Sequence, residues 1–349
     1  MELNFYKHNL ILREPFVSHK SVTDSGIEHV IVRLKWKNYE GVGVAVPAKE
    51  YGETAETISM VLEQYRPGLQ HSTPFERITV LENLQTLLPG HPAALSAIDI
   101  ALHDLLGKRL EQPIHRLLGL AGKALPPTAI SLGLMSNENT VSSLEKLCDW
   151  PVIKLKMSRP DESRLKLVRE HYRGRIWIDG NGAWNLKEAM KTLDRFERYG
   201  VELIEQPIAA GFPEHLKFLR ERTSLQVIAD EDCHSCKDIR RLSDCVDGVN
   251  IKLLKCGGLS NATKMITLAH DVGMSVMLGC KTESSIGITA MAQIGGLADY
   301  LDLDGHLDIE NDIFEGLKIV KGELQLPCAP GLGLTLKGNE SIPHGSCSV

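Results

Sequence analysis

Acidic side chains end three successive short apolar runs in the second half of this 349-residue sequence. The three residues are Asp179, Glu205 and Asp230. If the runs are parallel strands of one barrel, their carboxyl ends meet at one rim. Three carboxylates gathered there without a cation would repel one another and raise each other's pKa. Carboxylate oxygens in this number suit a hard divalent cation, so the residues are predicted to bind Mg²⁺, with Mn²⁺ as the second choice.

Lysines end two other runs. Lys154 and Lys156 are two residues apart and share one face of a strand. Lys252 ends a run four strands further along, which lies across the barrel, whereas Lys255 lies past the strand end and is expected to be structural. A lysine near a divalent cation and a second ammonium is expected to have a lowered pKa, which makes it a usable general base. Two lysines on opposite faces of a metal-bound substrate predict a 1,1-proton transfer, meaning racemisation or epimerisation.

The elements that carry these residues repeat regularly. Each apolar run is followed by an amphipathic stretch, and the starts of the runs lie 22 to 26 residues apart. Eight such units predict an α/β fold of the (β/α)₈ barrel type. The eighth unit looks incomplete, with at most a partial helix at Ile309–Phe314, so (β/α)₇β is the expected form. The runs begin with TAISLGL at 128, VIKLK at 152, IWID at 176, ELIEQ at 202, VIAD at 227, VNIKL at 249, SVMLG at 275 and DYLDLD at 299.

The first third of the chain has a different pattern. Three strands are predicted as an antiparallel meander, and three helices follow them. We therefore expect an α+β module at residues 1–122, a barrel at 123–322 and a segment at 323–349 that returns to the first module. The expected strands are Leu3–Leu12, Val30–Trp36 and Gly41–Val46, and the expected helices are Thr54–Tyr65, Thr73–Leu88 and His91–Lys108.

Composition excludes several classes of protein. The chain is 43% apolar and 24% charged, which is typical of a globular protein, and its net charge of −6 gives no general attraction to nucleic acid. No signal-peptide pattern or membrane-spanning run is found. Eight scattered cysteines indicate reduced thiols in the cytoplasm. The sequence leaves open whether the chain forms a homo-oligomer.

The charged strand ends lie in motifs that resemble the enolase superfamily, in its muconate-lactonizing-enzyme subgroup. These motifs are KLK at 154–156, DGNGAW at 179–184, IEQP at 204–207, ADE at 229–231 and NIKLLKCGG at 250–258. Their order and spacing cover the barrel, and the N-terminal module fits that family's capping domain. A lysine base with Mg²⁺ stabilising an ene-diolate is the chemistry of this superfamily.

The resemblance implies a role for each position. Asp179, Glu205 and Asp230 would be the Mg²⁺ ligands, and Lys156 and Lys252 the two acid/base residues. Lys154 would support Lys156 and touch the substrate carboxylate. Asn181 and Glu231 would lie next to the metal ligands without binding the metal themselves.

The last strand points to one branch of the subgroup. LDLDGH at 301–306 resembles the Asp-x-Asp motif of dipeptide epimerases, in which the two acids bind the substrate's free α-ammonium, and GCKTESSIGITA at 279–290 is similar to the same branch. Asp302 and Asp304 are therefore predicted to bind substrate. The resemblance implies that Lys20, in the loop Phe16–Ser25, meets the side-chain carboxylate of the substrate's second amino acid. Lys281 lies where an apolar residue such as Met is expected, and it is predicted to contact the substrate.

The resulting hypothesis is an Mg²⁺-dependent dipeptide epimerase that inverts the α-carbon of the C-terminal residue through a metal-stabilised enediolate. Other activities of the subgroup stay open: an N-acylamino-acid racemase with o-succinylbenzoate synthase activity, a muconate cycloisomerase or an acid-sugar dehydratase. A catalytically silent barrel that binds a carboxylate ligand is the alternative of a different class, and the intact set of lysines and acids argues against it.

Overall fold

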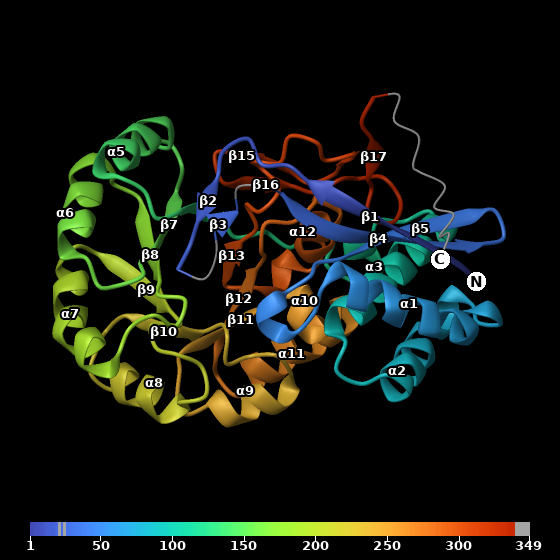
Figure 1. Ribbon diagram of the computed structural model, residues 1–349, viewed down its shortest axis with the longest axis horizontal. Helices are drawn as coiled ribbons and strands as arrows, with labels where there is room; N and C mark the ends of the chain where they lie inside the picture. The colour runs from blue at the N-terminus through green and yellow to red at the C-terminus, as the bar shows by residue number, and fades with distance from the viewer. Residues whose placement is uncertain (20–21, 24–25, 339–349) are drawn as a thin grey trace.

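Eight parallel strands form the barrel that the sequence predicts (Figure 1). The structure, a computed structural model, describes residues 1–19, 22–23 and 26–338. The strands neighbour one another in chain order, and a bridge between Thr128 and Leu301 links the first strand to the last, so the barrel is nearly closed. They are β6 (Ile130–Leu132), β7 (Val152–Lys156), β8 (Arg175–Asp179), β9 (Val201–Glu205), β10 (Gln226–Ala229), β11 (Gly248–Ile251), β12 (Ser275–Gly279) and β13 (Tyr300–Asp302).

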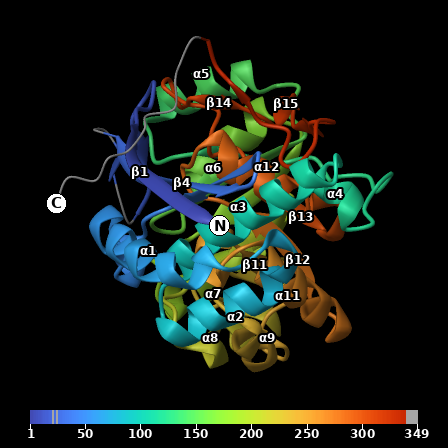
Figure 2. The same ribbon diagram turned by 90° about the vertical axis from the view of Figure 1, so that its right-hand side faces the viewer.

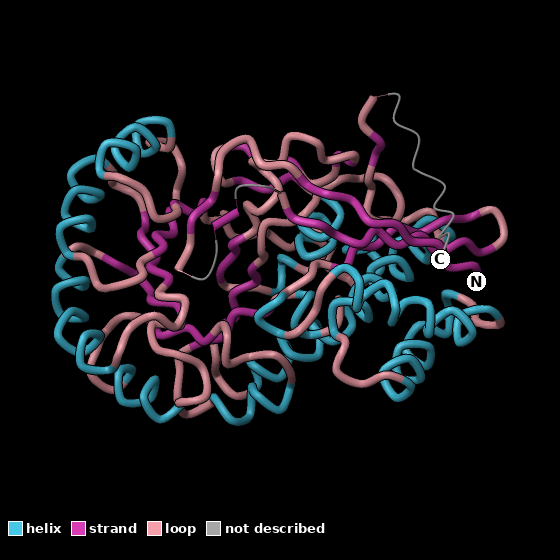
Figure 3. Tube along the Cα trace, viewed as in Figure 1, coloured by secondary structure: helices cyan, strands magenta, loops and turns pink. Residues whose placement is uncertain are grey.

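A helix follows each of the strands from β6 to β12, and these helices surround the barrel (Figure 3). A single helical turn, α10 (Leu253–Cys256), comes directly after β11. Residues 303–338, all of which are described, contain no helix, so the (β/α)₇β form is confirmed and the partial helix considered at 309–314 is absent. The outer helices are α5 (Asn137–Lys146), α6 (Glu162–His171), α7 (Leu186–Arg198), α8 (Pro213–Arg220), α9 (Cys236–Leu242), α11 (Leu259–Asp271) and α12 (Ser285–Ala292).

An apolar layer fills the barrel below the charged rim. Side chains of a strand alternate between its two faces, so a residue two positions after a member of this layer also points inward. On four strands that residue is charged and is one of the predicted site residues: Lys154 follows Val152, Asp179 follows Trp177, Glu205 follows Leu203, and Asp230 follows Ile228. The rim charges therefore stand on a water-excluding floor of Ala129, Val152, Trp177, Leu203, Ile228 and Met277, with Tyr300 against it.

The N-terminal unit is the predicted α+β module (Figure 2). Its antiparallel sheet has the order β1–β4–β5. The strands are β1 (Glu2–Leu10), β4 (Ile27–Trp36) and β5 (Tyr39–Ala45), and a short hairpin of β2 (Phe16–Val17) and β3 (Val22–Thr23) lies between β1 and β4 in the chain. The helical elements are the 3₁₀ turn η1 (Lys49–Tyr51), α1 (Ala55–Gln70), the 3₁₀ turn η2 (Pro74–Glu76), α2 (Arg77–Leu87), α3 (Pro92–Arg109) and α4 (Ile114–Leu117).

Helix α3 connects the N-terminal unit to the barrel. It lies directly on β5, where a Cβ on Gly41 or Gly43 would stand 2.1 Å or 2.0 Å from a backbone oxygen of α3. Its buried Asp99 accepts hydrogen bonds from Ser260 at the start of α11, from the backbone nitrogen at 2.7 Å and the hydroxyl at 2.8 Å. The two units therefore share buried polar contacts as well as apolar ones.

The segment after β13 contacts the N-terminal unit. The Leu332 nitrogen donates to Asp104 of α3 at 2.8 Å, and the Ile114 nitrogen donates to the Gly331 oxygen at 3.1 Å. This segment contains β14 (Phe314–Glu315) paired with β17 (Thr335–Leu336), and the hairpin β15 (Lys318–Val320) with β16 (Glu323–Gln325).

Two observations bear on the predicted cellular setting. The seven cysteines of the described residues are free. No helix within the described part of the chain has the length and apolar character needed to cross a membrane.

Candidate active site

The three predicted metal ligands lie on adjacent strands. Asp179 ends β8 and is paired in register with Glu205, which ends β9, while Asp230 directly follows β10. All three side chains are buried. The Glu205 Oε2 atom lies 2.6 Å from Lys154 Nζ without the geometry of a hydrogen bond, and no donor of the described residues hydrogen-bonds to it. The strand ends therefore bring the carboxylates to one place, as the sequence predicts.

Ammonium groups occupy the space beside these carboxylates. Lys154 Nζ lies 2.6 Å from Asp302, 2.6 Å from Glu205 and 3.4 Å from Asp179. The lysines are paired with the acids, and the described residues contain no group of three His, Cys, Asp or Glu side chains arranged as a complete metal site. Three buried carboxylates, one with an oxygen that lacks a hydrogen-bond donor, nevertheless fit the ligand chemistry of a hard divalent cation.

The two predicted acid/base lysines form ion pairs on opposite sides of the barrel. Lys156 Nζ lies 2.6 Å from Asp179, and Lys252 Nζ lies 2.7 Å from Asp230. Their side chains are 14% and 12% exposed, so each is reachable from the barrel mouth. The strand order places β7 and β11 four strands apart in an eight-stranded barrel, so the two amines face the rim from opposite walls.

Electrostatics at the rim reflect this pairing. Burial would raise the pKa of Asp179, but Lys156 and Lys154 hold that pKa at about 2. Burial raises the pKa of Glu205 to about 7, against the effect of Lys154. Burial likewise opposes the ionised form of Asp230, yet Lys252 and Lys255 keep its pKa well below the usual range.

The lysine pKa values run opposite to the sequence-based expectation. Burial disfavours the charged forms of Lys154 and Lys252, but the surrounding carboxylates raise the pKa of both well above the usual value. The expectation of a lowered pKa assumed a divalent cation among the acids. In the structure the negatively charged carboxylates lie next to the lysines, and nearby negative charge favours the ammonium form.

Asp302 and Asp304 lie together at the seam between β13 and β6. The Ser131 backbone nitrogen donates to Asp304 at 2.6 Å, and the Ser131 hydroxyl donates to Asp302 at 3.4 Å. Burial and the neighbouring Asp302 carboxylate raise the pKa of Asp304 to about 7. The predicted Asp-x-Asp pair is therefore assembled, with Asp302 directed at Lys154.

The remaining predicted contacts differ in position. Lys281 follows β12 and pairs with Glu50 of η1 at 2.6 Å, not with any metal-ligand candidate. Lys20 lies outside the described residues. His306, which ends the LDLDGH motif and has no predicted role, interacts with the Leu317 backbone and with Asp312, and burial lowers its pKa.

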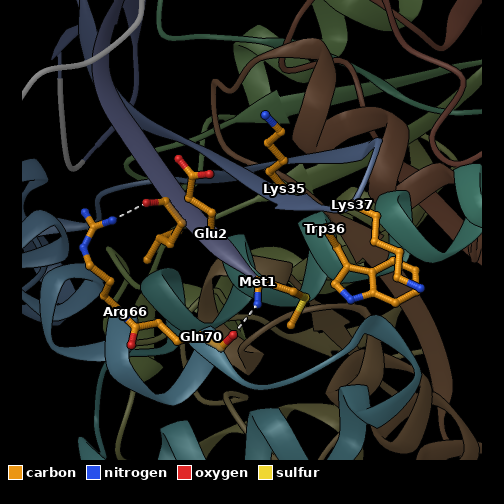
Figure 4. A pocket seen from close by; sticks show the side chains of 8 residues that line it. Met1, Glu2, Lys35, Trp36, Lys37, Arg66 and Gln70 are labelled. Atoms are coloured by element: carbon orange, nitrogen blue, oxygen red, sulfur yellow. Dashed lines mark hydrogen bonds between the residues drawn. The ribbon is translucent and has the colours of Figure 1, made fainter.

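Two hollows on the surface lie apart from these side chains. One is at the edge of the sheet of the N-terminal unit, where the start of β1 contacts α1 and lies beside the end of β4 (Figure 4). The other lies at the opposite rim of the barrel among arginines, where Arg175 is already paired with Glu202 and Arg169 donates to backbone carbonyls. Neither hollow contains a predicted site residue. The first is lined by Met1, Glu2, Leu3, Lys35, Trp36, Lys37, Arg66 and Gln70.

Two family models match the chain over most of its length. One describes the N-terminal domain of mandelate racemase and muconate lactonizing enzyme and matches residues 4–119. The other describes an enolase C-terminal domain-like unit and matches residues 137–341. The chain belongs to the mandelate racemase/muconate lactonizing enzyme family of the enolase superfamily.

Relatives within this family are similar over nearly the whole chain. An L-Ala-D/L-Glu epimerase of Bacteroides thetaiotaomicron is 33% identical over 96% of this chain and 88% of its own. A hydrophobic dipeptide epimerase of Roseobacter litoralis is 32% identical over 95% of this chain and 98% of its own. Among solved structures, a dipeptide epimerase from Cytophaga hutchinsonii complexed with Mg and D-Ala-L-Val is 26% identical, has a TM-score of 0.90, and covers 97% of this chain and 96% of that one.

The structure adds residues to the family motifs that sequence reasoning passed over. Asn250 donates to Glu205 at 2.8 Å, and its place two residues before Lys252 on β11 could have revealed it, since both share one face. Lys255, expected to be structural, lies 2.6 Å from Asp230 and is buried, so it positions a ligand candidate. The Gln206 side chain accepts from the backbone nitrogen of Asp230 at 2.9 Å, and no pattern in the sequence indicated this contact.

The two residues implied to lie behind the ligands are also close to them. The Asn181 nitrogen donates to Asp179 at 2.8 Å, from a backbone with a φ of 46°. Glu231 follows Asp230 directly and acts electrostatically on Lys252. Trp184 is buried against Phe196, with its indole nitrogen donating to Met157, which agrees with a packing role.

Proposed function

We propose that this protein is an Mg²⁺-dependent dipeptide epimerase that inverts the α-carbon of the C-terminal residue. The observation that carries the proposal is the pair of lysines, Lys156 and Lys252, on opposite walls of one barrel rim with buried carboxylates between them. Relatives that span nearly the full chain and are named as dipeptide epimerases support the choice of reaction.

Asp179, Glu205 and Asp230 are the residues that would hold Mg²⁺. When bound, the ion supplies positive charge that polarises the substrate carboxylate and stabilises the negative charge that develops on it. Glu205 Oε2, which accepts no hydrogen bond from a described residue although Lys154 Nζ lies 2.6 Å away, supports this assignment. Asn250, Lys255 and Gln206 hold the ligand side chains and backbone in position.

The two lysines divide the proton transfer between them. One lysine, as a neutral amine, takes the α-proton from its side of the substrate carbon. The other, as an ammonium, returns a proton to the opposite side, and the configuration is inverted. Because each amine approaches from its own wall, each acts on one epimer as the base and on the other as the acid. Lys154, within reach of Asp179 and Glu205, is suited to contact the substrate carboxylate.

Asp302 and Asp304 would bind the free α-ammonium of the dipeptide. A dipeptide separates its carboxylate from its ammonium by an α-carbon, an amide and a second α-carbon. Two acids at the β13 seam beside Lys154 suit a cation at that separation from the reacting centre. Substrates of N-acylamino-acid racemases, o-succinylbenzoate synthases and muconate cycloisomerases lack this ammonium, so the two acids would have no cation to bind in them. These activities are the alternatives to the proposed epimerase.

We assign the enzyme to the cytoplasm. The seven free cysteines of the described residues support a reducing compartment. The net charge of −6 favours a small-molecule substrate over nucleic acid.

The test is α-proton exchange in D₂O across a dipeptide library, with Mg²⁺ present. We expect deuterium at the α-carbon of the C-terminal residue, followed by accumulation of the other diastereomer. N-succinylamino acids and N-acetyl dipeptides serve as matched substrates for the alternatives. Faster exchange of those N-acyl compounds than of any free dipeptide would replace the epimerase proposal with the racemase reading.

A further inference from the structure

The 3₁₀ turn η1 of the N-terminal unit reaches the barrel rim at two points. Tyr51 lies edge-on to the ring of His234, which follows β10, with 4.7 Å between ring centroids. Its neighbour Glu50 lies 2.6 Å from Lys281, which follows β12. Strand β11 lies between β10 and β12 in the sheet and leads into Lys252. The turn therefore bridges the rim above the wall that carries Lys252.

The position above Lys252 is supported by electrostatics and packing. Burial and the Asp230 carboxylate raise the pKa of Tyr51, while Lys252 acts on it in the opposite direction, so all three groups are near one another. The turn is anchored because Tyr51 packs with the buried side chains of Ala48 and Leu254. Contacts at both ends and an apolar anchor make η1 a fixed roof.

Glu50 and Lys281 place opposite charges in this roof. Their side chains are 34% and 35% exposed, so both are partly accessible to solvent. Among the described residues, Lys281 has no other ion-pair partner. A charged substrate side chain under the roof would have to compete with one member of the pair for the other, whereas an uncharged side chain leaves the pair intact.

We propose that the Glu50–Lys281 ion pair selects the side chain of the epimerised residue, favouring uncharged side chains and disfavouring both acidic and basic ones. The inference rests on the proposed function, because it takes Lys252 to face the α-carbon of that residue. The roof stands over Lys252, so the side chain on that carbon is the one that meets it. The proposal therefore names dipeptides with a neutral C-terminal residue as the substrate class.

The test deletes each charge separately and follows the ranking of substrates. We would measure kcat/KM for L-Ala-L-Ala, L-Ala-L-Leu, L-Ala-L-Glu and L-Ala-L-Lys. Glu50→Gln leaves Lys281 without its partner, so the rate with L-Ala-L-Glu relative to L-Ala-L-Leu should rise about twofold to fivefold, typical of a partly exposed ion pair. Lys281→Met removes one cation beside Glu50, so the relative rate with L-Ala-L-Lys should rise, by no more than that factor.

Two further proteins guard against indirect effects. The exchanged pair Glu50→Lys with Lys281→Glu keeps an ion pair across the roof, so the preference for neutral side chains should return. Lys321→Met removes one charge from the exposed pair that Lys321 forms with Asp149, and should leave the ranking unchanged. Circular dichroism and thermal melting of each variant would show whether it is folded.

The outcomes separate this inference from the proposed function. If wild-type protein epimerises dipeptides and neither single variant changes the ranking by charge, the roof inference is wrong and the proposed function stands. A wild-type preference for charged side chains would also overturn the inference. If wild-type protein exchanges no dipeptide α-proton, the proposed function fails and this inference fails with it.

Discussion

The two walls of the barrel rim carry nearly identical lysine–aspartate pairs. On the β7–β8 wall, Lys156 lies 2.6 Å from Asp179, and on the β10–β11 wall, Lys252 lies 2.7 Å from Asp230. The lysine side chains are almost equally exposed. This near-symmetry suits a reaction in which either side of one carbon gives up or receives the proton.

The second lysine of each wall makes the difference. On the β7–β8 wall, Lys154 joins Asp179 to Glu205 and Asp302, so this wall is part of a network of two lysines and three acids. On the opposite wall, Lys255 contacts Asp230 and the backbone of Asn250, so two ammonium groups share one carboxylate side chain. One wall is thus connected to Asp302 of β13, and among the described residues the lysines of the other wall form their ion pairs with Asp230.

Removing the metal should have the largest effect, because it affects both walls at once. Exhaustive treatment with EDTA should abolish epimerisation, and added Mg²⁺ should restore it. Replacing Asp179, Glu205 or Asp230 with Ala should each lower kcat by several orders of magnitude, since the positive charge is needed most in the transition state. Full activity after chelation would contradict the assignment of these three acids.

Replacing one lysine should stop proton transfer at one wall of the barrel rim and leave proton transfer at the other wall intact. Lys156→Ala or Lys252→Ala should stop net epimerisation, because no group remains to act on that side of the α-carbon. The remaining lysine should still exchange the α-proton of one diastereomer with D₂O, and the two variants should differ in which diastereomer that is. Near wild-type epimerisation by either variant would rule out the two-base mechanism.

In the metal-free protein, replacing Asp230 should lower the free energy of unfolding more than replacing Asp179. Asp230→Asn leaves Lys252 and the buried Lys255 without an ionised side-chain partner, and uncompensated buried charges of this kind cost about 3–5 kcal/mol. Asp179→Asn leaves Lys154 with Glu205 and Asp302, and the lysine that loses its ion pair, Lys156, is 14% exposed, whereas Lys255 is 1% exposed. Urea unfolding in EDTA should therefore show a greater loss of stability for Asp230→Asn, and equal losses would mean that the walls are not different in this way.

The β13 acids sharpen the comparison because they serve only the connected wall. Asp304→Asn, or N-acetylation of a good dipeptide, should lower kcat/KM by about 30-fold or more, since losing one partner of a desolvated charged pair costs about 2–5 kcal/mol. Metal binding and α-proton exchange chemistry should be retained. If N-acetyl dipeptides react as well as free dipeptides, these acids do not bind the ammonium.

The pH profile should give the smallest effect. The pKa of Asp304 is raised to about 7, so below that pH the carboxyl is neutral and its attraction for an ammonium is lost. At saturating Mg²⁺, kcat/KM for free dipeptides should rise about tenfold between pH 6 and pH 7.5, then fall above about pH 8 as the substrate amine loses its proton. Asp304→Asn should flatten the acid limb, and an unchanged limb would assign it to another group.

The sequence predicts the charged rim because each repeated strand–helix unit brings the end of its strand to the same rim of the barrel. Strand starts every 22 to 26 residues predicted the barrel, and the strand ends carried the lysines and acids in order. The two lysine walls follow from the count of strands between Lys156 and Lys252. The division of the chain at residues 122 and 322 stays a prediction.

The contacts that sequence reasoning missed depend on side chains meeting across elements. Lys281 and Glu50 are 231 residues apart, and nothing local indicates that η1 reaches β12. Gln206 holds the Asp230 backbone from a residue with a φ of 33°, an unusual conformation that composition does not predict. The direction of each lysine pKa shift depends on which carboxylates lie close to its ammonium group. Those distances are not contained in the sequence.

Helix α3 limits how this enzyme can be modified. Its buried Asp99 holds the start of α11, and its buried Asp104 holds both Val42 of β5 and Leu332 of the returning C-terminal segment. An N-terminal unit grafted from a relative would have to reproduce these buried acceptors, or the Ser260 and Leu332 donors outside that unit would lose their hydrogen-bond partners. Transplanting η1 alone disturbs neither acceptor. Engineering of substrate range should therefore succeed by exchanging short rim segments, and fail when the whole N-terminal unit is exchanged as a module.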